Sequence, residues 1–180
     1  MQPVVHLAVG YVCYAAYTRS RYDAVPDEAP ALAAIVGTAL PDLIDKPIWL
    51  AGIVDVGRTV GHSLLFALPL VVAVWLFARA RGHPILGVAF TVGYLSHVAT
   101  DVPWHVISGD YEELGFLLWP ITPMPAYTGT KPLVTLGGLE VTVTTLWLEV
   151  VILVAGVALW WVDGRPGTGV FRRRLGDGSS

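Results

Sequence analysis

Apolar residues are concentrated in five segments of the chain, separated by shorter polar stretches. A transmembrane helix needs about 20 apolar residues to cross a hydrocarbon core of roughly 30 Å. The last two segments reach this length, whereas the first two require burial by packing or local thinning of the bilayer. The pattern predicts an all-α fold, a helical bundle integral to a membrane with four or five transmembrane helices. The segments are Pro3–Tyr17, Ala31–Leu43 (which "IWLAGIV" can extend), His62–Ala78, Pro84–Trp104 and Val141–Val162.

The composition agrees with this prediction. The chain is 54% hydrophobic and 14% charged, with a mean hydropathy of +0.63, which suits an integral membrane protein better than a soluble one. Its 180 residues suffice for one domain, expected over 1–163 with a loop at 105–140, before a polar, disordered tail at 164–180. A net charge of −3 without a basic block argues against nucleic-acid binding. The single Cys13 excludes a disulfide framework and a thiolate zinc cluster.

The basic residues predict the orientation of the bundle. No basic residue precedes the first apolar segment, so we expect a retained span and not a cleaved signal peptide. With five spans and the amino terminus outside, the inner side has more basic residues than the outer side, as the positive-inside rule requires. We therefore expect a multi-pass protein of the inner or plasma membrane, with its N-terminus outside and its C-terminus inside. The inner residues are Arg19, Arg21, Arg79, Arg81, Arg165, Arg172, Arg173 and Arg174, and the outer ones are Lys46, Arg58 and Lys131.

This topology brings the candidate metal-binding side chains to one membrane face, at the outer ends of four spans. Histidines and carboxylates are costly in or beside a bilayer, so they usually face the interior of a bundle and pair with another group. His83 lies in a turn on the opposite side and cannot join them. The residues that meet are His6, Asp42, Asp45, His62, His97 and Asp101.

Each local motif also allows a simpler role. In "GYLSHVATDVPWH", His97 and Asp101 are four residues apart and share one helix face, where they either bind a metal or form a polar pair. In "GRTVGHSLL", His62 is either a ligand or a residue at the start of a helix that Ser63 or Thr59 caps. The acids of "PDLID" can cap or end a helix, and His6 can lie at the interface without binding anything.

Imidazole and carboxylate ligands without thiolates suit zinc, manganese or iron, with zinc the first expectation for several histidines. Asp45 could be a further ligand, an orienter of a histidine or a general base. Arg58 could clamp an anionic substrate oxygen, or it could pair with Asp55. The residues that we expect to bind a divalent ion are His6, Asp42, His62, His97 and Asp101.

Other polar positions have less defined roles. Glu149 lies well inside the fifth segment, where it could orient a ligand or hold helices together. Pro103 should bend or end the fourth helix, which separates His105 from Asp101. The motif "DYEELGFLLWP" is either a lid over the site or a plain interfacial loop.

The order of these motifs carries a resemblance. An early His6, then "PDLID", "GHSLLF", "GYLSHVATD" and "GFLLWP" together resemble the YdjM-type family of membrane-bound, predicted metal-dependent hydrolases, also described as LexA-binding, inner-membrane-associated hydrolases. The similarity runs to about Pro120. Members tend to have a histidine-arginine pair before the second histidine motif, and here "VGRTVGHS" keeps Arg58 but has Gly57 in place of that histidine. The resemblance implies a hydrolase site at His6, Asp42, Asp45, His62, His97 and Asp101.

The sequence thus predicts a membrane-bound, metal-dependent hydrolase. A bound metal would lower the pKa of its water towards about 7 and polarise the scissile group. A site at the membrane-water interface suits an amphiphilic substrate, such as a lipid-like molecule or a phosphoester. The alternative is a non-enzymatic membrane protein in which the same residues form a structural metal site or an ion or proton pathway.

Overall fold

The computed structural model describes residues 2–102, 106, 109, 111–124 and 143–169. Within these residues the chain forms five α-helices and the 3-10 helix η2, without any strand, so the all-α part of the prediction is confirmed. Each α-helix overlaps one of the five apolar segments. The elements are α1 (Pro3–Tyr22), α2 (Glu28–Leu50), α3 (Leu64–Ala80), α4 (Pro84–Thr100), η2 (Glu112–Leu118) and α5 (Val143–Val162).

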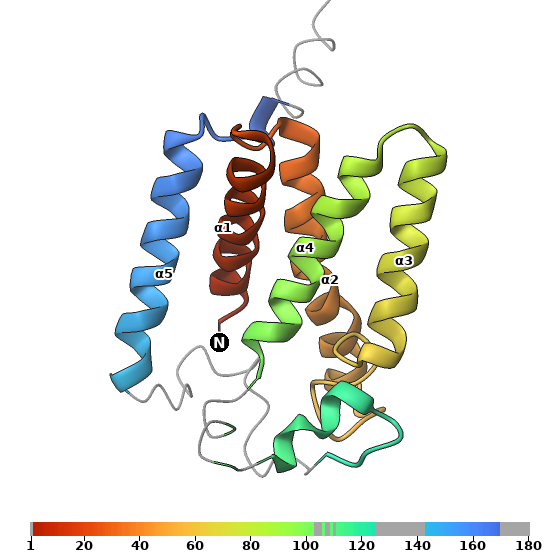
Figure 1. The fold of residues 1–180 in the computed structure, drawn as a ribbon. Coiled ribbons are helices and arrows are strands. Elements are labelled where there is room, and N and C mark those ends of the chain that lie inside the picture. The colour runs from red at the N-terminus through yellow and green to blue at the C-terminus, as the bar shows by residue number, and fades with distance from the viewer. Residues whose placement is uncertain (1, 103–105, 107–108, 110, 125–142, 170–180) are drawn as a thin grey trace, which may run out of the picture.

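The helices lie side by side as a bundle, with α5 at one edge and α3 at the other (Figure 1). Helix α4 packs against α1, α2 and α3, and α5 packs against α1. The start of α1, the end of α2, the start of α3 and the end of α4 lie at the same end of the bundle, the lower end in Figure 1. We call this the site end, because it carries the histidines and aspartates discussed below.

Local chemistry explains where the helices begin and end. Helices α1 and α4 begin with a proline, whose missing N–H costs nothing in the first turn. Ser63 is the N-cap of α3 and accepts a hydrogen bond from the backbone N–H of Leu65 at 3.3 Å, so His62 lies just outside that helix. Helix α4 ends at Thr100 and not at Trp104, because the backbone before Pro103 is restricted.

Across the described residues, none of the helices combines the length and the apolar character that a membrane crossing needs. The transmembrane part of the predicted fold therefore remains a prediction.

Helices α2 and α4 approach each other at a glycine. A Cβ atom added to Gly93 would lie 2.0 Å from the backbone oxygen of Ala34, a distance that no side chain tolerates. The absence of a side chain at this position allows the two backbones to pack directly against each other. Because His97 lies one turn further along α4, this contact also fixes the position of His97 relative to α2.

Helix α5 is joined to α1 at both ends. At the end opposite the site, Asp163 is buried, accepts a hydrogen bond from the Tyr11 hydroxyl at 2.6 Å and forms an ion pair with Arg19. At the site end, the Glu149 carboxylate accepts a hydrogen bond from the backbone N–H of Gln2 at 3.2 Å. Glu149 therefore ties α5 to the amino terminus of α1, where a negative charge also favours the helix dipole.

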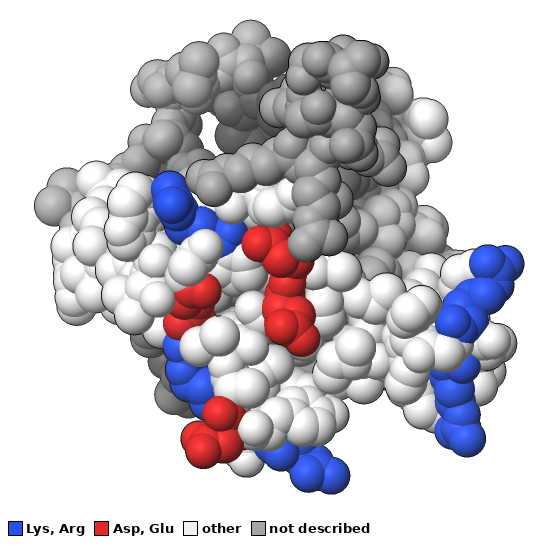
Figure 2. Space-filling model, turned by 90° about the horizontal axis from the view of Figure 1, so that it is seen from above, with Lys and Arg blue, Asp and Glu red and all other residues white. Residues whose placement is uncertain are grey.

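The end opposite the site is rich in arginine. Figure 2 views this end from above and shows basic side chains on several sides of it, with acidic side chains between them. The end comprises the carboxyl ends of α1, α3 and α5 and the amino ends of α2 and α4. The arginines in or just after those carboxyl ends are Arg19, Arg21, Arg79, Arg81 and Arg165.

Parts of two predicted regions can be described. Residues 164–169, the start of the predicted tail, fold back towards α2, where Glu28 accepts hydrogen bonds from the backbone N–H groups of Gly167 and Gly169. The predicted loop at 105–140 is described at 106, 109 and 111–124. The rest of both regions lies outside the described residues, as do Trp104, His105, Lys131 and Arg172, Arg173 and Arg174.

Candidate metal centre

The structure brings together the six side chains that the sequence singled out. His6 comes from α1, Asp42 and Asp45 from the last part of α2, and His62 from the loop before α3. His97 lies in the last turn of α4, and Asp101 is the residue that ends it. His83 lies exposed in the turn between α3 and α4, at the opposite end of the bundle.

His62 lies at the centre of the cluster. Its Nε2 atom lies 3.1 Å from Nε2 of His97 and 3.0 Å from Oδ2 of Asp101. Oδ1 of Asp42 lies 4.0 Å from the same nitrogen of His62 and 3.9 Å from Nε2 of His97. Four potential ligand atoms from α2, α4 and the loop before α3 therefore point towards one small volume.

Asp45 orients the His62 ring. Oδ2 of this carboxylate accepts a hydrogen bond from Nδ1 of His62 at 2.7 Å, which leaves the lone pair of His62 Nε2 pointing into the cluster. The same carboxylate accepts hydrogen bonds from the backbone N–H and hydroxyl of Thr59, at 2.7 and 3.0 Å, and from the backbone N–H of Gly61 at 2.9 Å. Both oxygens are buried and occupied. Among the three roles that the sequence allowed, the geometry favours the orienting one.

The loop before α3 is held tightly against the bundle. A Cβ atom at Gly61 would lie 2.6 Å from the backbone oxygen of Pro41, so only glycine allows the loop to approach α2 this closely. The backbone oxygen of Gly61 accepts a hydrogen bond from the hydroxyl of Tyr94 in α4 at 2.6 Å. These contacts fix the backbone beside His62 from two helices.

The electrostatics of the loop follow from these hydrogen bonds. Burial would raise the pKa of Asp45, but hydrogen bonds from His62, Gly61 and Thr59 hold this pKa below its ordinary value. The carboxylates of Asp45 and Asp101 both face the His62 ring, so they favour a cation, either a proton or a metal ion, at its Nε2 atom.

His6 lies on the other side of His97. Their rings stack with centroids 4.1 Å apart. Nδ1 of His6 lies 2.9 Å from the hydroxyl of Thr100, and Nε2 lies 3.3 Å from Oδ1 of Asp101. The Asp101 carboxylate thus faces His6 with one oxygen and His62 with the other.

His97 contains a polar atom without a partner. Its side chain is 1% exposed, and no described residue offers a hydrogen bond to its Nδ1 atom. An unsatisfied buried polar group costs about 1–3 kcal/mol. The ring is therefore placed by the contact of its Nε2 atom with His62 and by stacking on His6, and not through Nδ1.

Two cations lie at the more exposed side of the cluster. Nζ of Lys46 lies 2.5 Å from Oδ2 of Asp42, and Nε of Arg58 lies 3.2 Å from Oδ2 of Asp101. Lys46 is 31% exposed and Arg58 22%, whereas the three clustered histidines are at most 3% exposed. Arg58 contacts Asp101, and not Asp55 as the simpler sequence interpretation allowed. We call Lys46, Arg58 and the partly exposed Asp42 the rim of the site.

Helix η2 covers the cluster from the side. Phe116 is completely buried, with its ring centroid 6.3 Å from that of His62 in an edge-on arrangement. The guanidinium of Arg58 lies 5.7 Å from the centroid of the same ring. The hydroxyl of Ser63 donates a hydrogen bond to the backbone oxygen of Trp119 at 2.7 Å. The "GFLLWP" motif therefore shields the site.

Sequence reasoning missed the supporting residues. The i, i+4 spacing of Asp42 and Lys46 on a helix could have indicated their ion pair. The contacts of Thr59 and Tyr94 depend on how the loop folds, and no local pattern indicates them. Thr100 was likewise missed, although its hydroxyl supports His6.

The donor set fits a divalent cation. Two groups of three ligand atoms each lie within 4.8 Å of one another, and both groups contain His97. Nitrogen and carboxylate donors of this kind suit zinc, manganese or iron. Metal ligation by any of these residues remains a prediction. The first group is His6, His97 and Asp101, and the second is Asp42, His62 and His97.

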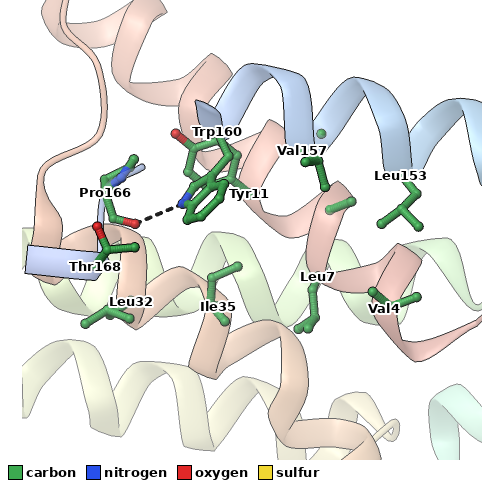
Figure 3. Close-up of a pocket in the computed structure, with 13 residues that line it drawn as sticks. Val4, Leu7, Tyr11, Leu32, Ile35, Leu153, Val157, Trp160, Pro166 and Thr168 are labelled. Atoms are coloured by element: carbon green, nitrogen blue, oxygen red, sulfur yellow. Dashed lines mark hydrogen bonds between the residues drawn. The ribbon is translucent and has the colours of Figure 1, made fainter. Parts of the chain in front are cut away.

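An apolar pocket of about 350 Å³ lies elsewhere, between α1, α2 and α5 (Figure 3). Its α1 lining, Val4, Leu7, Ala8 and Tyr11, lies on a different helix face from His6, which contacts α4. The pocket lining contains no histidine or carboxylate, so this pocket is not the candidate metal centre.

Comparison with known proteins gives one match. The family model described as "YdjM inner membrane protein" matches residues 1–166, which include the whole cluster. No curated protein and no solved structure matches the chain.

Proposed function

The chain belongs to the YdjM inner membrane protein family, and we propose that it is a membrane-bound, metal-dependent hydrolase with its catalytic centre at the His/Asp cluster. The observation that carries the proposal is the convergence of Nε2 of His62, Nε2 of His97 and Oδ2 of Asp101, in a buried cluster with a partly exposed rim. Catalytic metal sites combine this type of donor with an open coordination position.

Some residues of the cluster would bind the metal directly, and others position these ligands. His6, Asp42, His62, His97 and Asp101 would hold the ion, which on binding acidifies a water molecule and polarises the substrate. Asp45 keeps His62 in the tautomer that presents Nε2 to the cluster. Partners of this type usually contribute 10–100-fold to metal affinity or activity. Among the three roles that the sequence allowed, we therefore propose that Asp45 is a positioning residue and not a general base.

The rim supports an anionic substrate. Lys46 and Arg58 are partly exposed cations, and each contacts a carboxylate of the cluster. A substrate that approaches from solvent meets these two side chains first. Cations of this kind bind phosphate and carboxylate oxygens through charge-assisted hydrogen bonds. A phosphoester, including a lipid-like one, is the substrate class that we propose.

The location at a membrane is the second part of the proposal. The family description supports an inner-membrane protein. The clustering of arginines at the end opposite the site supports a multi-pass topology with that end inside and the site end outside. In this arrangement the rim would lie near lipid headgroups, where amphiphilic esters are available.

The first test is the metal content of the gently purified protein, measured by elemental mass spectrometry. We expect bound zinc, manganese or iron in the wild type and a lower metal content in His62→Ala and His97→Ala. His83→Ala is the matched control, because His83 lies at the opposite end and should not affect metal content. A metal-free wild type, even after reconstitution with each ion, would contradict the hydrolase proposal.

The second test separates catalysis from a structural role. We expect the metal-loaded protein to hydrolyse members of a panel of soluble and lipid phosphoesters, with the activity lost in His97→Ala. Azide should also change the absorption spectrum of the cobalt-substituted protein, because a catalytic site has an open position. A bound metal without either response would favour the non-enzymatic, structural site.

A further inference from the structure

We propose that the cluster binds two divalent ions, with the Asp101 carboxylate between them. The inference rests on the proposed function, because it concerns the same site, and it makes a separate prediction about stoichiometry. Two observations support the proposal. The donor atoms form two groups, and hydrogen bonds already occupy the Nδ1 atoms of His62 and His6, so their Nε2 atoms face Asp101.

The donor atoms form two overlapping groups. Ligands of one zinc ion lie about 2.0–2.3 Å from it, so any two of them are at most roughly 4.6 Å apart. The ligand atoms within each group satisfy this condition approximately, because they lie within 4.8 Å of one another. One group consists of His6, His97 and Asp101, and the other consists of Asp42, His62 and His97. The two groups contain five different residues because His97 belongs to both, and its neutral ring has one lone pair, which binds one ion. Asp101 can contribute to both ions, because one of its oxygens faces His6 and the other faces His62.

The hydrogen bonds around His62 leave an acceptor facing an acceptor. Its Nδ1 donates to Asp45, so its neutral ring has only a lone pair at Nε2. That lone pair lies 3.0 Å from a carboxylate oxygen of Asp101. Two acceptors at this distance repel each other unless a cation or a proton lies between or beside them.

His6 repeats the same arrangement on the other oxygen of Asp101. Two backbone oxygens of α4 lie 2.9 Å from the Thr100 hydroxyl, which donates its one proton to them and can then accept from Nδ1 of His6. Nε2 of His6 then presents a lone pair 3.3 Å from Oδ1 of Asp101. Each oxygen of one carboxylate therefore faces its own imidazole lone pair. Two cations, one beside each contact, satisfy this geometry.

The charges of the site are compatible with two ions. The carboxylates of Asp42, Asp45 and Asp101 exceed the two rim cations by one negative charge. Two divalent ions would change this to a net positive charge beside the exposed rim. Sites of this type stabilise both the attacking and the leaving oxygens in phosphoryl displacement. A two-ion centre is therefore compatible with the phosphoester substrates proposed above.

The experiment measures metal stoichiometry. The full-length protein is loaded with excess Mn²⁺ or Zn²⁺ and desalted, and the ions per chain are counted by elemental mass spectrometry. We expect two ions per chain in the wild type and one in His6→Gln, which removes a donor from only one group. Asp42→Asn should also bind one ion, and His83→Gln should bind two. One ion in the saturated wild type, or two in His6→Gln, would overturn the proposal.

A spectroscopic measurement detects the contact between the ions directly. At two equivalents of Mn²⁺, we expect the electron paramagnetic resonance spectrum of an exchange-coupled pair in the wild type. His6→Gln should give the spectrum of an isolated ion. If His6→Gln does not fold, Thr100→Val replaces it, because this change removes the acceptor that orients His6. We expect it to lower the affinity for one of the two ions about 10–100-fold, and wild-type affinity for both ions would overturn the proposal.

The two-ion proposal and the proposed hydrolase function can be contradicted separately. Two ions without hydrolysis of any phosphoester would contradict the proposed function and leave the two-ion centre intact. One ion with hydrolysis would contradict the two-ion centre alone. Wild-type protein without bound metal, in which two protons occupy the contacts of Asp101, would contradict both.

Discussion

The Asp45 carboxylate holds Nδ1 of His62 at 2.7 Å, and this contact joins α2 to the loop before α3. Every partner of Asp45 is a donor, since Thr59 and Gly61 also donate to it. A carboxylate is the side chain that can accept all of these hydrogen bonds together. The orientation of the central histidine therefore depends on one buried acid.

We expect Asp45→Asn to weaken metal binding about 10–100-fold, because its amide group would face a donor and release the His62 ring. The variant should also lower the free energy of unfolding by about 1–3 kcal/mol. Metal affinity is measured by competition with a chromogenic chelator, and stability by thermal unfolding.

The control for this prediction is Asp55→Asn. Asp55 is an exposed acid in the same loop, so its amide variant should match the wild type in both measurements. Wild-type metal affinity in Asp45→Asn would contradict the positioning role of Asp45.

We expect Gly93→Ala to disturb both the packing and the site. Its Cβ atom would lie 2.0 Å from the backbone oxygen of Ala34, so α2 and α4 must move apart. Overpacking of this kind typically costs about 1–3 kcal/mol. His97 lies one turn away and would move relative to Asp42, so the melting temperature and the metal affinity should both fall. Ala99→Ser, an exposed change on the same helix, should alter neither, and an unchanged Gly93→Ala would contradict the direct contact between the helices.

The sequence was sufficient to predict the helices, because long apolar runs need a regular backbone with internal hydrogen bonds. It left the end of α2 open, at Leu43 or within the extension "IWLAGIV", and the helix continues to Leu50 with Pro41 and Pro47 inside it. Proline disfavours a helix interior, but Asp45 and Trp49 are buried in this part of α2 and stabilise it. Tertiary contacts therefore decided where this helix ends.

The clustering of the candidate residues was predictable from the sequence, whereas the individual contacts between them were not. His6, His62 and His97 lie together because the order of the helices places them at one end of the bundle. The roles of Asp45 and Lys46 depend on which atom faces which neighbour, at distances near 3 Å. A topology argument places residues at one end of a helix but does not resolve such contacts.

We expect the two rim cations to contribute to the binding of inorganic phosphate by the metal-loaded protein. Lys46→Gln and Arg58→Gln should each raise the dissociation constant about tenfold, because a hydrogen bond to a charged group contributes about 1.5–3 kcal/mol. Arg58→Lys should retain part of the affinity, since it keeps the charge and loses the planar fork. The affinity is measured by isothermal titration calorimetry.

The metal content of each rim variant is measured in the same preparations, so that loss of an ion is not mistaken for loss of phosphate binding. Arg81→Gln, at the opposite end of the bundle, is the control and should bind phosphate like the wild type. Unchanged phosphate binding in both Lys46→Gln and Arg58→Gln would exclude the rim as an anion site.

The distribution of arginines predicts which side of the membrane the site faces. Positively charged residues are retained on the inner side, and the described arginines lie mainly at the end opposite the cluster. In a Cys13→Ala background, Asp55→Cys at the site end should react with a membrane-impermeant maleimide in intact cells. Arg81→Cys should react only after the cells are permeabilised. Both positions are exposed, so a difference between them reports on the side of the membrane and not on burial. The reverse pattern would place the metal centre on the cytoplasmic side, and labelling of both positions in intact cells would contradict an opposite-side arrangement of the two ends.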